Sequence, residues 1–471
     1  MVLARTHMND RAKAGSIEEA ISGTLDRCER SQSDLNAFAR IDRDGALATA
    51  RKLDAGEQSG PLAGIPISVK DILNVSGLPT NWGSRLMQDA APAVADTVAV
   101  ARLRAAGAVI IGKSTTTEFA HTMMGSSPLT GLTVNPWNAN ITCGGSSCGG
   151  GVSVAAGLVR IALTTDAGAS TRLPAACTGV LGLKPTLGRI PHDLVPEGFA
   201  NFIHLGAITR NVSDMALALE TMAGPTLSDP HSLAVPPVDI SRINARAGDP
   251  AGKRIGLIMR TGNARISRTM SDTIRRVASN FEKFGASVSE IEWTIDNPEP
   301  TWRILQQSNW AARLGKQIDE VESKIEPSLA EGVRTGLSYS GPDLQGALNR
   351  RTTIFRHVQK LFEDFDFLLT PVMSREPLDA MHKPLEPISI DGEAVGDMRR
   401  EWTPYLNLFD LSGHPAISVP TAISDSGVPL AFQLVAPWYE EAGLLAAVAF
   451  YEQQHPWPLP DAVREVENSK S

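Results

Sequence analysis

The chain has 471 residues, 42% of them hydrophobic and 20% charged, and its formal net charge is −8. This length suffices to bury a large core, and the acidic balance argues against the basic face of a nucleic-acid-binding protein. Four scattered cysteines do not make a disulfide scaffold in a chain of this size. No segment has the roughly 18 uncharged apolar residues of a membrane span. We therefore expect a cytoplasmic protein that binds neither nucleic acid nor a membrane and contains no metal or cofactor.

The N-terminal part of the chain is expected to be helical. Ser16 precedes two glutamates and an apolar periodicity, which is the pattern of a capped amphipathic helix, and we expect helices over residues 16–55. Residues 8–60 are assigned to an N-terminal helical cover. From residue 61 the pattern changes to short apolar runs bounded by glycine and proline, which predict buried strands. Strands are predicted at residues 65–69, 109–111, 161–164 and 205–209, with helices between them at 97–106 and 213–222.

The second half of the chain continues this alternation. Residues 235–249 are irregular and are expected to be a linker inside one domain, and residues 295–362 are mostly helical. The other predicted elements are strands at 254–259, 365–370, 416–419 and 431–435 and helices at 271–284 and 440–451. The alternation predicts an α/β fold with one large, mostly parallel or mixed central sheet, covered by helices on both faces.

Two short motifs are interpreted as coincidental. Residues 107–114 match the phosphate-loop pattern G-x-x-x-x-G-K-S, but the four residues after Gly107 are apolar, form a strand and leave no loop to surround a phosphate. Residues 145–149 match the G-x-S-x-G nucleophile elbow, which requires a strand directly before it. The turn-forming residues 135–140 precede this motif instead.

A glycine-rich loop at residues 144–151 contains two serines, Ser146 and Ser147. Glycines at this density allow close approach of the backbone to a ligand or unusual backbone angles. A flexible linker is the alternative interpretation. The small-residue helix predicted directly after the loop, at 152–158, argues against a linker, because a linker seldom opens into a packed helix.

Two further elements end on polar side chains. A predicted strand leads into a loop of small residues that ends at Ser170, where a helix N-cap is the simpler interpretation of the serine alone. Asp166 and Arg172 flank this loop and are expected to brace it as an ion pair. An apolar run ends at Lys70, and a lysine at the end of a strand usually extends to solvent.

Taken together and in chain order, these elements resemble the amidase signature family. The matching segments are Pro61-Leu62-Ala63-Gly64-Ile65-Pro66-Ile67-Ser68-Val69-Lys70-Asp71, the Gly-Gly-Ser-Ser block at 144–147, residues 165–176, Gly179-Val180-Leu181-Gly182-Leu183-Lys184-Pro185-Thr186, Phe367-Leu368-Leu369-Thr370-Pro371 and Leu411-Ser412-Gly413-His414-Pro415-Ala416. The combination is highly specific and covers nearly the whole chain. The resemblance implies the fold of that family in a single domain, 1–471, divided into a catalytic core at 61–230, a variable helical pocket region at 235–362 and C-terminal strands and a helix at 363–460 that complete the sheet.

The resemblance also implies a Ser-Ser-Lys triad. It assigns Ser170 as nucleophile, Ser146 as proton relay and Lys70 as base, and it places a cis peptide bond between Gly145 and Ser146. The implied oxyanion-hole donors are the backbone N–H groups of Ala167, Gly168, Ala169 and Ser170. Asp166, Arg172 and Ser147 are expected to support the triad from around it.

Lysine suits the role of base only under certain conditions. A serine hydroxyl is a weak nucleophile and needs an adjacent base, and none of the nine histidines lies in the three segments that hold the triad. A lysine can accept a proton only if burial lowers its pKa enough to populate the neutral amine. The apolar run before Lys70 predicts such burial. In the implied reaction Lys70 takes a proton from Ser146, which takes one from Ser170, and Ser170 attacks the carbonyl carbon to form an acyl-enzyme.

Two positions depart from the family pattern and affect the expected substrate. Ala169 and Cys148 each stand where that family usually has glycine. The expected reaction is hydrolysis of a carboxamide or related C–N bond in a small molecule, and ester, carbamate and urea-type substrates could use the same machinery. Residues expected to line the substrate pocket are Met123, Met124, Gly125, Ser126, Trp302 and Trp310.

The main rival function is glutamine-dependent transamidation, in which the chain would resemble the ammonia-releasing subunit of glutamyl-tRNA amidotransferase. That subgroup usually reads Gly-Ser-Ser-Thr-Glu-Asn-Ser where residues 125–131 here read Gly-Ser-Ser-Pro-Leu-Thr-Gly, which favours a stand-alone hydrolase. A non-catalytic binding protein is disfavoured because all three triad side chains are present. A homodimer is the assembly that the sequence leaves open.

Overall fold

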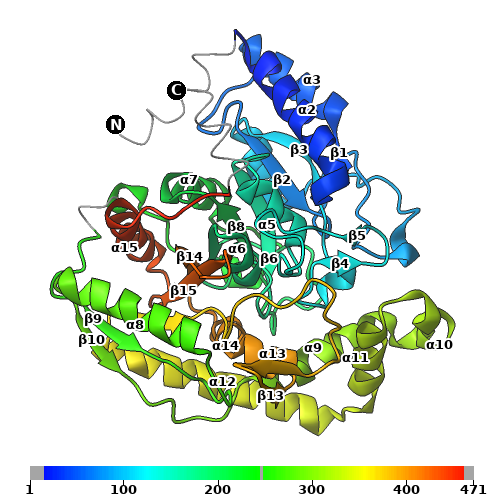
Figure 1. Ribbon diagram of the computed structural model, residues 1–471. Coiled ribbons are helices and arrows are strands. Elements are labelled where there is room, and N and C mark those ends of the chain that lie inside the picture. Colours follow the sequence, from blue (N-terminus) through cyan, green and yellow to red (C-terminus); the bar gives the residue numbers. More distant parts are fainter. Residues whose placement is uncertain (1–14, 244–247, 461–471) are drawn as a thin grey trace.

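The computed structural model describes residues 15–243 and 248–460, so that residues 8–14 of the predicted N-terminal cover lie outside the described residues. The strands of its main sheet are β1 (Phe38–Ile41), β2 (Pro66–Lys70), β3 (Val109–Ser114), β6 (Ile161–Asp166), β7 (Leu181–Lys184), β8 (His204–Thr209), β9 (Arg254–Leu257), β10 (Ser287–Glu290), β11 (Phe367–Pro371), β14 (Ala416–Ile423) and β15 (Pro429–Val435). They form one 11-stranded sheet in the order β1-β3-β2-β6-β8-β7-β14-β15-β11-β9-β10 (Figure 1). The sheet mixes parallel and antiparallel pairs, which confirms the predicted large mixed sheet.

The pairing of β2 with β6 positions the functional residues. These strands run parallel, with Val69 opposite Leu163. The carboxyl ends of parallel strands lie at the same edge of a sheet, and loops at that edge commonly carry the site of an α/β protein. Lys70 at the end of β2 and Asp166 at the end of β6 therefore come to the same edge.

Most predicted strands are confirmed, with one correction near the N-terminus. Residues 16–55 were expected to be helical throughout, but β1 separates α2 (Ile17–Leu35) from α3 (Arg43–Asp54). Asn36 ends α2 in the left-handed conformation, with φ of 48°, and the Asp42 side chain caps α3 by accepting from the Gly45 N–H. The strand between them has only four residues and shows no clear alternation, so helical periodicity on both sides conceals it.

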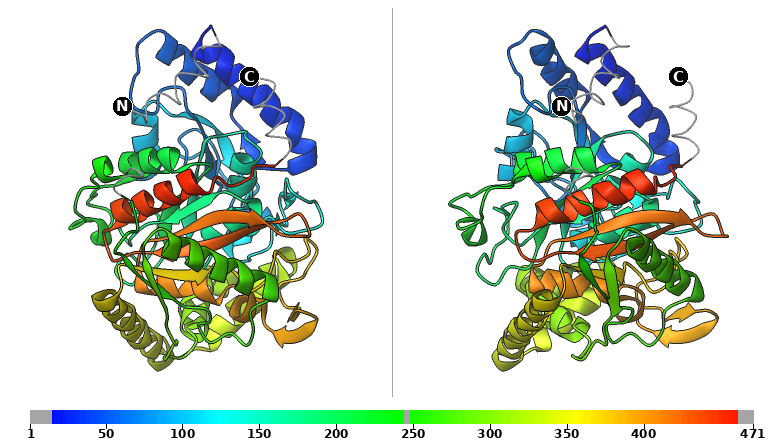
Figure 2. Two further views of the ribbon diagram at one scale, coloured as in Figure 1. Left: turned by 60° about the vertical axis from the view of Figure 1, so that its left-hand side comes forward. Right: turned by 90° about the vertical axis from the view of Figure 1, so that its left-hand side faces the viewer.

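Helices cover both faces of the sheet, as predicted. On one face lie α4 (Val98–Ala105), α7 (Val212–Met222), α8 (Arg268–Lys283) and α15 (Glu441–Gln454). The other face carries α5 (Cys148–Ala155), α6 (Arg172–Thr178), α9 (Glu299–Leu314), α12 (Gly341–Asp364) and α14 (Pro404–Ser412). Figure 2 shows α7 and α15 side by side on the first face. Along β6, Ile161 and Leu163 pack with the first set and Ala162 with the second, which is the alternation expected of a strand buried on both sides.

The remaining elements lie beside the second face. They are α10 (Ile318–Val321), α11 (Pro327–Ser338), the pair β12 (Ile388–Ile390) and β13 (Glu393–Gly396), α13 (Met398–Trp402), and the small pair β4 (Ser126–Ser127) and β5 (Gly131–Leu132). In Figure 1, α9 to α13 occupy the end of the molecule opposite α2 and α3.

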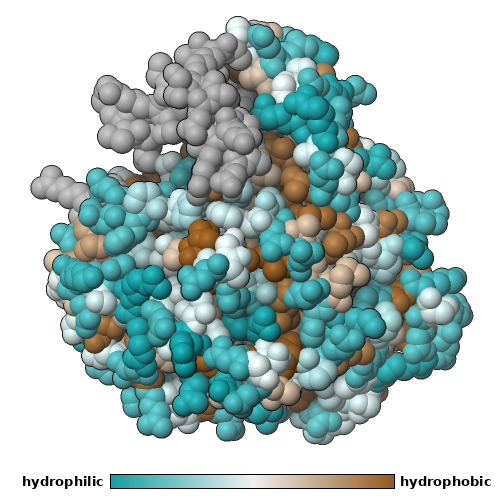
Figure 3. Space-filling model, in the orientation of Figure 1, coloured by the Kyte–Doolittle hydropathy of each residue, from teal (hydrophilic) through white to brown (hydrophobic). Residues whose placement is uncertain are grey.

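The surface is mostly hydrophilic on the face that Figure 3 shows, and hydrophobic residues reach it in separate patches. Within the described part of the chain, none of the helices combines the length and the apolar character that crossing a bilayer demands.

Candidate active site

The proposed base is a buried lysine in contact with a serine. Lys70 is fully buried, and its Nζ lies 2.7 Å from the Oγ atom of Ser146 and 3.0 Å from Oγ1 of Thr165. Burial lowers the pKa of Lys70 to about 7, against the opposing influence of Cys148 and Asp166. A large fraction of the amine is therefore neutral near pH 7 and has a lone pair that can accept a proton from the Ser146 hydroxyl.

The Gly-Ser-Ser loop is packed between other segments, so the flexible-linker interpretation is wrong. The Gly145–Ser146 peptide bond is cis. A Cβ atom on Gly145 would lie 2.8 Å from the carbonyl oxygens of Thr122 and Met124, so only glycine fits there. The Ser147 N–H donates to the Ser170 carbonyl at 3.2 Å, which joins this loop directly to the loop of the predicted nucleophile.

A single carboxylate organises the loop that ends at Ser170. Oδ1 of Asp166 accepts from the N–H groups of Gly168 and Ser170 at 3.2 and 2.9 Å, and Oδ2 accepts from those of Thr171 and Arg172, each at 3.2 Å. Burial disfavours the charge, but the Arg172 guanidinium outweighs it and holds the pKa of Asp166 well below its usual value. The carboxylate therefore fixes the loop in one turn, in place of the helix N-cap that Ser170 alone would suggest.

This arrangement changes the expected oxyanion hole. Four N–H groups were predicted to point into it, but those of Gly168 and Ser170 donate to Asp166. The N–H groups of Ala167 and Ala169 are the members of the predicted set that Asp166 does not occupy. Ser170 itself is partly buried, and its hydroxyl has no hydrogen-bond partner among the residues that the structure describes.

Arg172 ties the loop to distant parts of the chain. Its Nε lies 2.9 Å from Asp166, Nη2 lies 2.6 Å from Asp410 in α14, and Nη1 donates to Gln433 in β15 at 2.8 Å. The side chains of Arg172 and both aspartates are completely buried. The ion pair expected between Asp166 and Arg172 is thus present. No local pattern in the sequence indicates Asp410 and Gln433, because they follow Arg172 by 238 and 261 residues.

One of the two predicted tryptophans contacts this loop, and the other packs against the first. Nε1 of Trp302 donates to the carbonyl oxygen of Ala167 at 2.5 Å. A Cβ atom on Gly168 would lie 2.7 Å from the same indole nitrogen, so the ring covers this glycine. Trp310 packs edge-on against Trp302, with 6.3 Å between ring centroids.

The four pocket residues predicted at 123–126 lie in two different environments. Met123 and Met124 are buried in one apolar cluster with Ala169, the residue before Ser170. Gly125 packs against the Cys143 sulfur, and Ser126 is exposed on β4. No hydrogen bond of the described chain joins these last two residues to the Ser170 loop.

The structure explains the phosphate-loop match. Residues 109–114 form β3, and Nζ of Lys113 lies 2.9 Å from Oδ1 of Asp71, both side chains being 1% exposed. Lys113 also donates to Oγ1 of Thr80 at 3.0 Å. The lysine that would contact a phosphate is therefore held inside the protein, which confirms the interpretation of this motif as a strand.

Comparison with known proteins agrees with this geometry. Residues 19–445 match the model of the Amidase family. Acylamidase from Rhodococcus erythropolis is 30% identical over 452 residues, which cover 94% of this chain and 93% of that protein. A glutamyl-tRNA(Gln) amidotransferase subunit from Cyanothece sp. is 31% identical over 484 residues, covering 96% and 97% of the two chains. The crystal structure of a bacterial aryl acylamidase of the amidase signature enzymes superposes with a TM-score of 0.87 at 27% identity, covering 96% and 95%. The chain therefore belongs to the amidase signature family and is a hydrolase of carbon–nitrogen bonds.

Proposed function

We propose that the chain hydrolyses small-molecule amides through an acyl-enzyme on Ser170, with Ser146 as proton relay and Lys70 as base. The observation that carries this proposal is the 2.7 Å hydrogen bond between Lys70 and Ser146, made by a buried lysine whose pKa is lowered to about 7. The two other fully buried lysines of the described chain have different partners: Lys113 is paired with the Asp71 carboxylate, and Lys184 donates to the backbone carbonyl oxygens of Pro185 and His414. Lys70 instead contacts the hydroxyl groups of Ser146 and Thr165.

The proposed reaction uses the hydrogen bond between Lys70 and Ser146 and the hydrogen bond from the Ser147 N–H to the Ser170 carbonyl, which holds the two serine loops together. The Ser170 hydroxyl oxygen attacks the amide carbon while its proton passes to Ser146, whose own proton passes to Lys70. N–H groups of the 166–170 loop stabilise the oxyanion, and those of Ala167 and Ala169 are free to do so because they do not donate to Asp166. Such donors typically contribute about 3 to 4 kcal/mol each. The relay then runs in reverse, protonates the amine nitrogen and releases it. Water attacks the resulting ester through the same relay, which frees the acid and restores Ser170.

The relatives support an acyl amide as substrate. Two of the similar proteins are named acylamidase and aryl acylamidase. Esters, carbamates and urea-type compounds present the same carbonyl to Ser170 and form the second group of candidate substrates. The four buried, unpaired cysteines of the described chain support the cytoplasmic location that we propose with this activity.

Transamidation is the competing function, since the Cyanothece amidotransferase protein is equally similar in sequence. Residues 126–132 form the small hairpin β4–β5 and differ from the sequence usual in that subgroup. We therefore propose a stand-alone hydrolase.

The test is a comparison of substrates and variants. The purified chain should release 4-nitroaniline from 4-nitroacetanilide, and Ser170→Ala and Lys70→Met should abolish the release. Glutamine forms the second arm of the assay. Release of ammonia from glutamine without hydrolysis of any anilide, ester or carbamate would favour the transamidation function instead.

A further inference from the structure

Arg399 carries a positive charge that no acidic side chain balances directly. Its guanidinium carbon lies 3.9 Å from the centroid of the Trp302 ring. The guanidinium makes one hydrogen bond to the described residues, from Nη2 to the His121 carbonyl at 3.3 Å, and it forms no ion pair with any of their carboxylates. Burial lowers the pKa of Arg399 to about 10, so the group stays charged at neutral pH. Arg172, which is fully buried, is paired with two aspartates, whereas the partly buried Arg399 has no such partner among the described residues.

Two ring nitrogens beside Arg399 are also without partners. Nε1 of Trp310 and Nδ1 of His121 are buried and form no hydrogen bond to the described part of the chain. The two rings are in edge contact, with centroids 5.2 Å apart, and Trp310 also contacts Trp302. A buried polar atom without a hydrogen-bond partner is unfavourable in the folded protein. Arg399 and Trp310 both contact Trp302, and His121 contacts Trp310 and accepts from Arg399 through its carbonyl oxygen, so these groups from three segments lie together.

The hydrogen bonds of Ser328 determine which ring nitrogen of His121 carries the proton. The Ser328 hydroxyl donates its one proton to the carboxylate of Glu326, so its oxygen can only accept from Nε2 of His121, 2.8 Å away. Burial lowers the pKa of His121 to about 3, so the ring is neutral. The proton is thus on Nε2, and Nδ1 presents a lone pair that accepts a hydrogen bond.

This group of residues adjoins the proposed oxyanion loop. Trp302, which Arg399 covers, donates to the Ala167 carbonyl and packs on Gly168. On the other side, His121 leads into Met123, whose sulfur accepts from the Thr403 hydroxyl just beyond α13. A ligand group held between Arg399 and Trp310 would therefore lie close to an amide bound at Ser170.

We propose that Arg399, Trp302, Trp310 and His121 form a subsite for a carboxylate of the substrate, so that the preferred amides carry a carboxylate near the bond to be cleaved. The guanidinium and the Trp310 N–H would donate to the carboxylate oxygens, a charge-assisted contact. The Trp302 face would pack on the adjacent apolar part of the substrate, and His121 Nδ1 would accept from a substrate N–H or O–H. This inference rests on the proposed hydrolase function.

The experiment compares substrates that differ in charge. 4-Nitroacetanilide is neutral, N-(4-nitrophenyl)succinamic acid carries a carboxylate on the acyl side, and 4-acetamidobenzoate carries one on the amine side. We expect kcat/KM to be at least ~10-fold higher for one of the two carboxylates than for the neutral anilide. Arg399→Met should lower kcat/KM for that substrate by ~100-fold, and the loss on the neutral anilide should be at least ~10-fold smaller. Trp310→Phe, which removes the N–H together with part of the indole ring, should lower kcat/KM for the carboxylate substrate about fivefold.

Arg313 provides the matched control. Its guanidinium carbon lies 4.3 Å from the Trp82 ring centroid, so it makes the same kind of contact with a different tryptophan. Arg313→Met should leave the ratio of the two kcat/KM values unchanged. Equal losses on charged and neutral substrates in Arg399→Met, or no preference for either carboxylate in the parent, would overturn the subsite.

Binding separates this inference from the proposed function. In the Ser170→Ala background, calorimetry should detect binding of the preferred carboxylate, and Arg399→Met should weaken it ~100-fold. Absence of binding, or binding that Arg399→Met does not change, would overturn the subsite whatever the enzyme hydrolyses. Failure of the parent to hydrolyse any amide or to react with a fluorophosphonate at Ser170 would instead refute the proposed hydrolase.

Discussion

The Nζ atom of Lys70 is hydrogen-bonded to the Ser146 hydroxyl at 2.7 Å, and both side chains are fully buried. Because burial lowers the lysine pKa to about 7, the neutral amine forms as the pH rises through that value. We therefore expect kcat/KM to rise with pH along a single ionisation centred near pH 7 and to level off above it. A pH profile on an uncharged anilide measures this directly. A rate that falls as the pH rises through 7 would mean that the protonated lysine is the active form.

Substitutions of Lys70 distinguish a role as proton-accepting base from a role as a positive charge that positions Ser146. Lys70→Arg keeps the charge, but its guanidinium cannot accept a proton at these pH values, so acylation should fall by about 10²- to 10⁴-fold. Lys70→Met keeps much of the side-chain length and should be equally inactive yet folded, as circular dichroism and thermal unfolding would show. Near-parental activity of Lys70→Arg would show that the lysine only positions Ser146.

Arg172→Ala should lower both stability and activity. The substitution leaves the carboxylates of Asp166 and Asp410 buried without their cation, which should reduce the free energy of unfolding by about 3 to 5 kcal/mol. Chemical denaturation measures this loss, and kcat should fall with it because Asp166 holds the loop of Ser170. A loss of activity at unchanged stability would point to direct contact of Arg172 with substrate.

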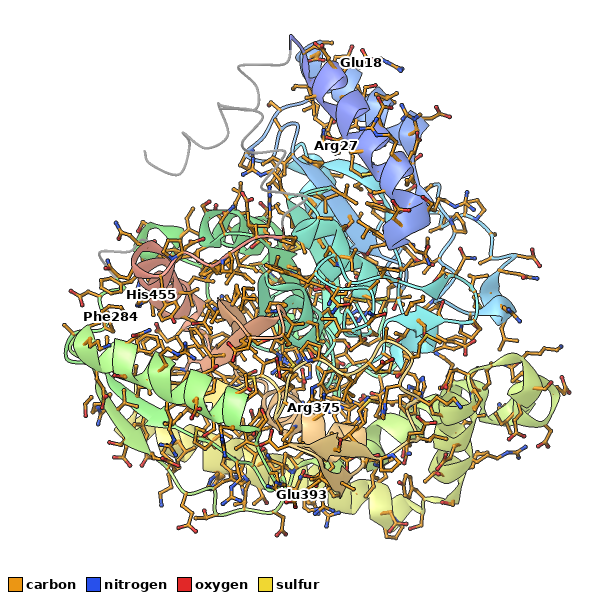
Figure 4. All side chains as sticks on the ribbon, viewed as in Figure 1. Glu18, Arg27, Phe284, Arg375, Glu393 and His455 are labelled. Atoms are coloured by element: carbon orange, nitrogen blue, oxygen red, sulfur yellow. The ribbon has the colours of Figure 1, made fainter. Side chains whose placement is uncertain are left out.

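Arg43 is the control for that measurement. It forms ion pairs with Asp26 and Glu29 of α2, but its side chain is 34% exposed. Helix α2, which carries the labelled Glu18 and Arg27, lies at the opposite end of the molecule from α12 and α13 (Figure 4). Arg43→Ala should leave both the denaturation midpoint and kcat unchanged, because exposed ion pairs contribute little to stability.

Trp302→Phe should lower kcat by removing one hydrogen bond that supports the loop of Ser170. The substitution removes the N–H that donates to Ala167 and keeps an aromatic ring over Gly168. We expect kcat on the neutral anilide to fall about fivefold, the equivalent of ~1 kcal/mol. Trp457→Phe removes a comparable indole bond, to the Arg210 carbonyl, and should leave kcat unchanged. Equal effects of the two substitutions would contradict a specific role for Trp302.

Lys113 should behave as a structural residue. Lys113→Met leaves the Asp71 carboxylate buried without its ion-pair partner and should lower the free energy of unfolding by about 3 kcal/mol. Calorimetric titration of the parent with ATP should show no binding. Binding that Lys113→Met abolishes would contradict the interpretation of residues 107–114 as a strand.

Taken alone, the segments of Lys70 and Ser170 favour a solvent-exposed lysine and a helix N-cap, and the structure shows neither. Only the combination of the segments resembles the amidase signature family and assigns the triad. Strands β2 and β6 were predicted from short apolar runs bounded by glycine and proline, and both are present. Parallel pairing then brings two of these strand ends to one edge. The strand β1 was missed because its four residues lie between two clear helices.

The partners of these residues could not be predicted in the same way. Asp410 and Gln433 reach Arg172 only after the strands β14 and β15 and the helix α14 have folded against the loop, and no local pattern indicates such contacts. The oxyanion-hole prediction missed the competition for N–H groups, because the sequence does not show that the Asp166 carboxylate turns back onto its own loop. Arg399 could not be identified from the sequence either, because only the folded structure shows that it has no ion-pair partner among the described residues.

The most direct test of the account is to identify the residue that becomes acylated. The parent enzyme is incubated with a fluorophosphonate, its intact mass is measured, and the modified peptide is mapped by tandem mass spectrometry. We predict a single adduct on the hydroxyl of Ser170, which has no competing hydrogen bond among the described residues, complete loss of labelling in Ser170→Ala, and slow labelling in Lys70→Met. An adduct on Ser146 or Ser147, or undiminished labelling of Ser170→Ala, would contradict the assignment of Ser170 as nucleophile.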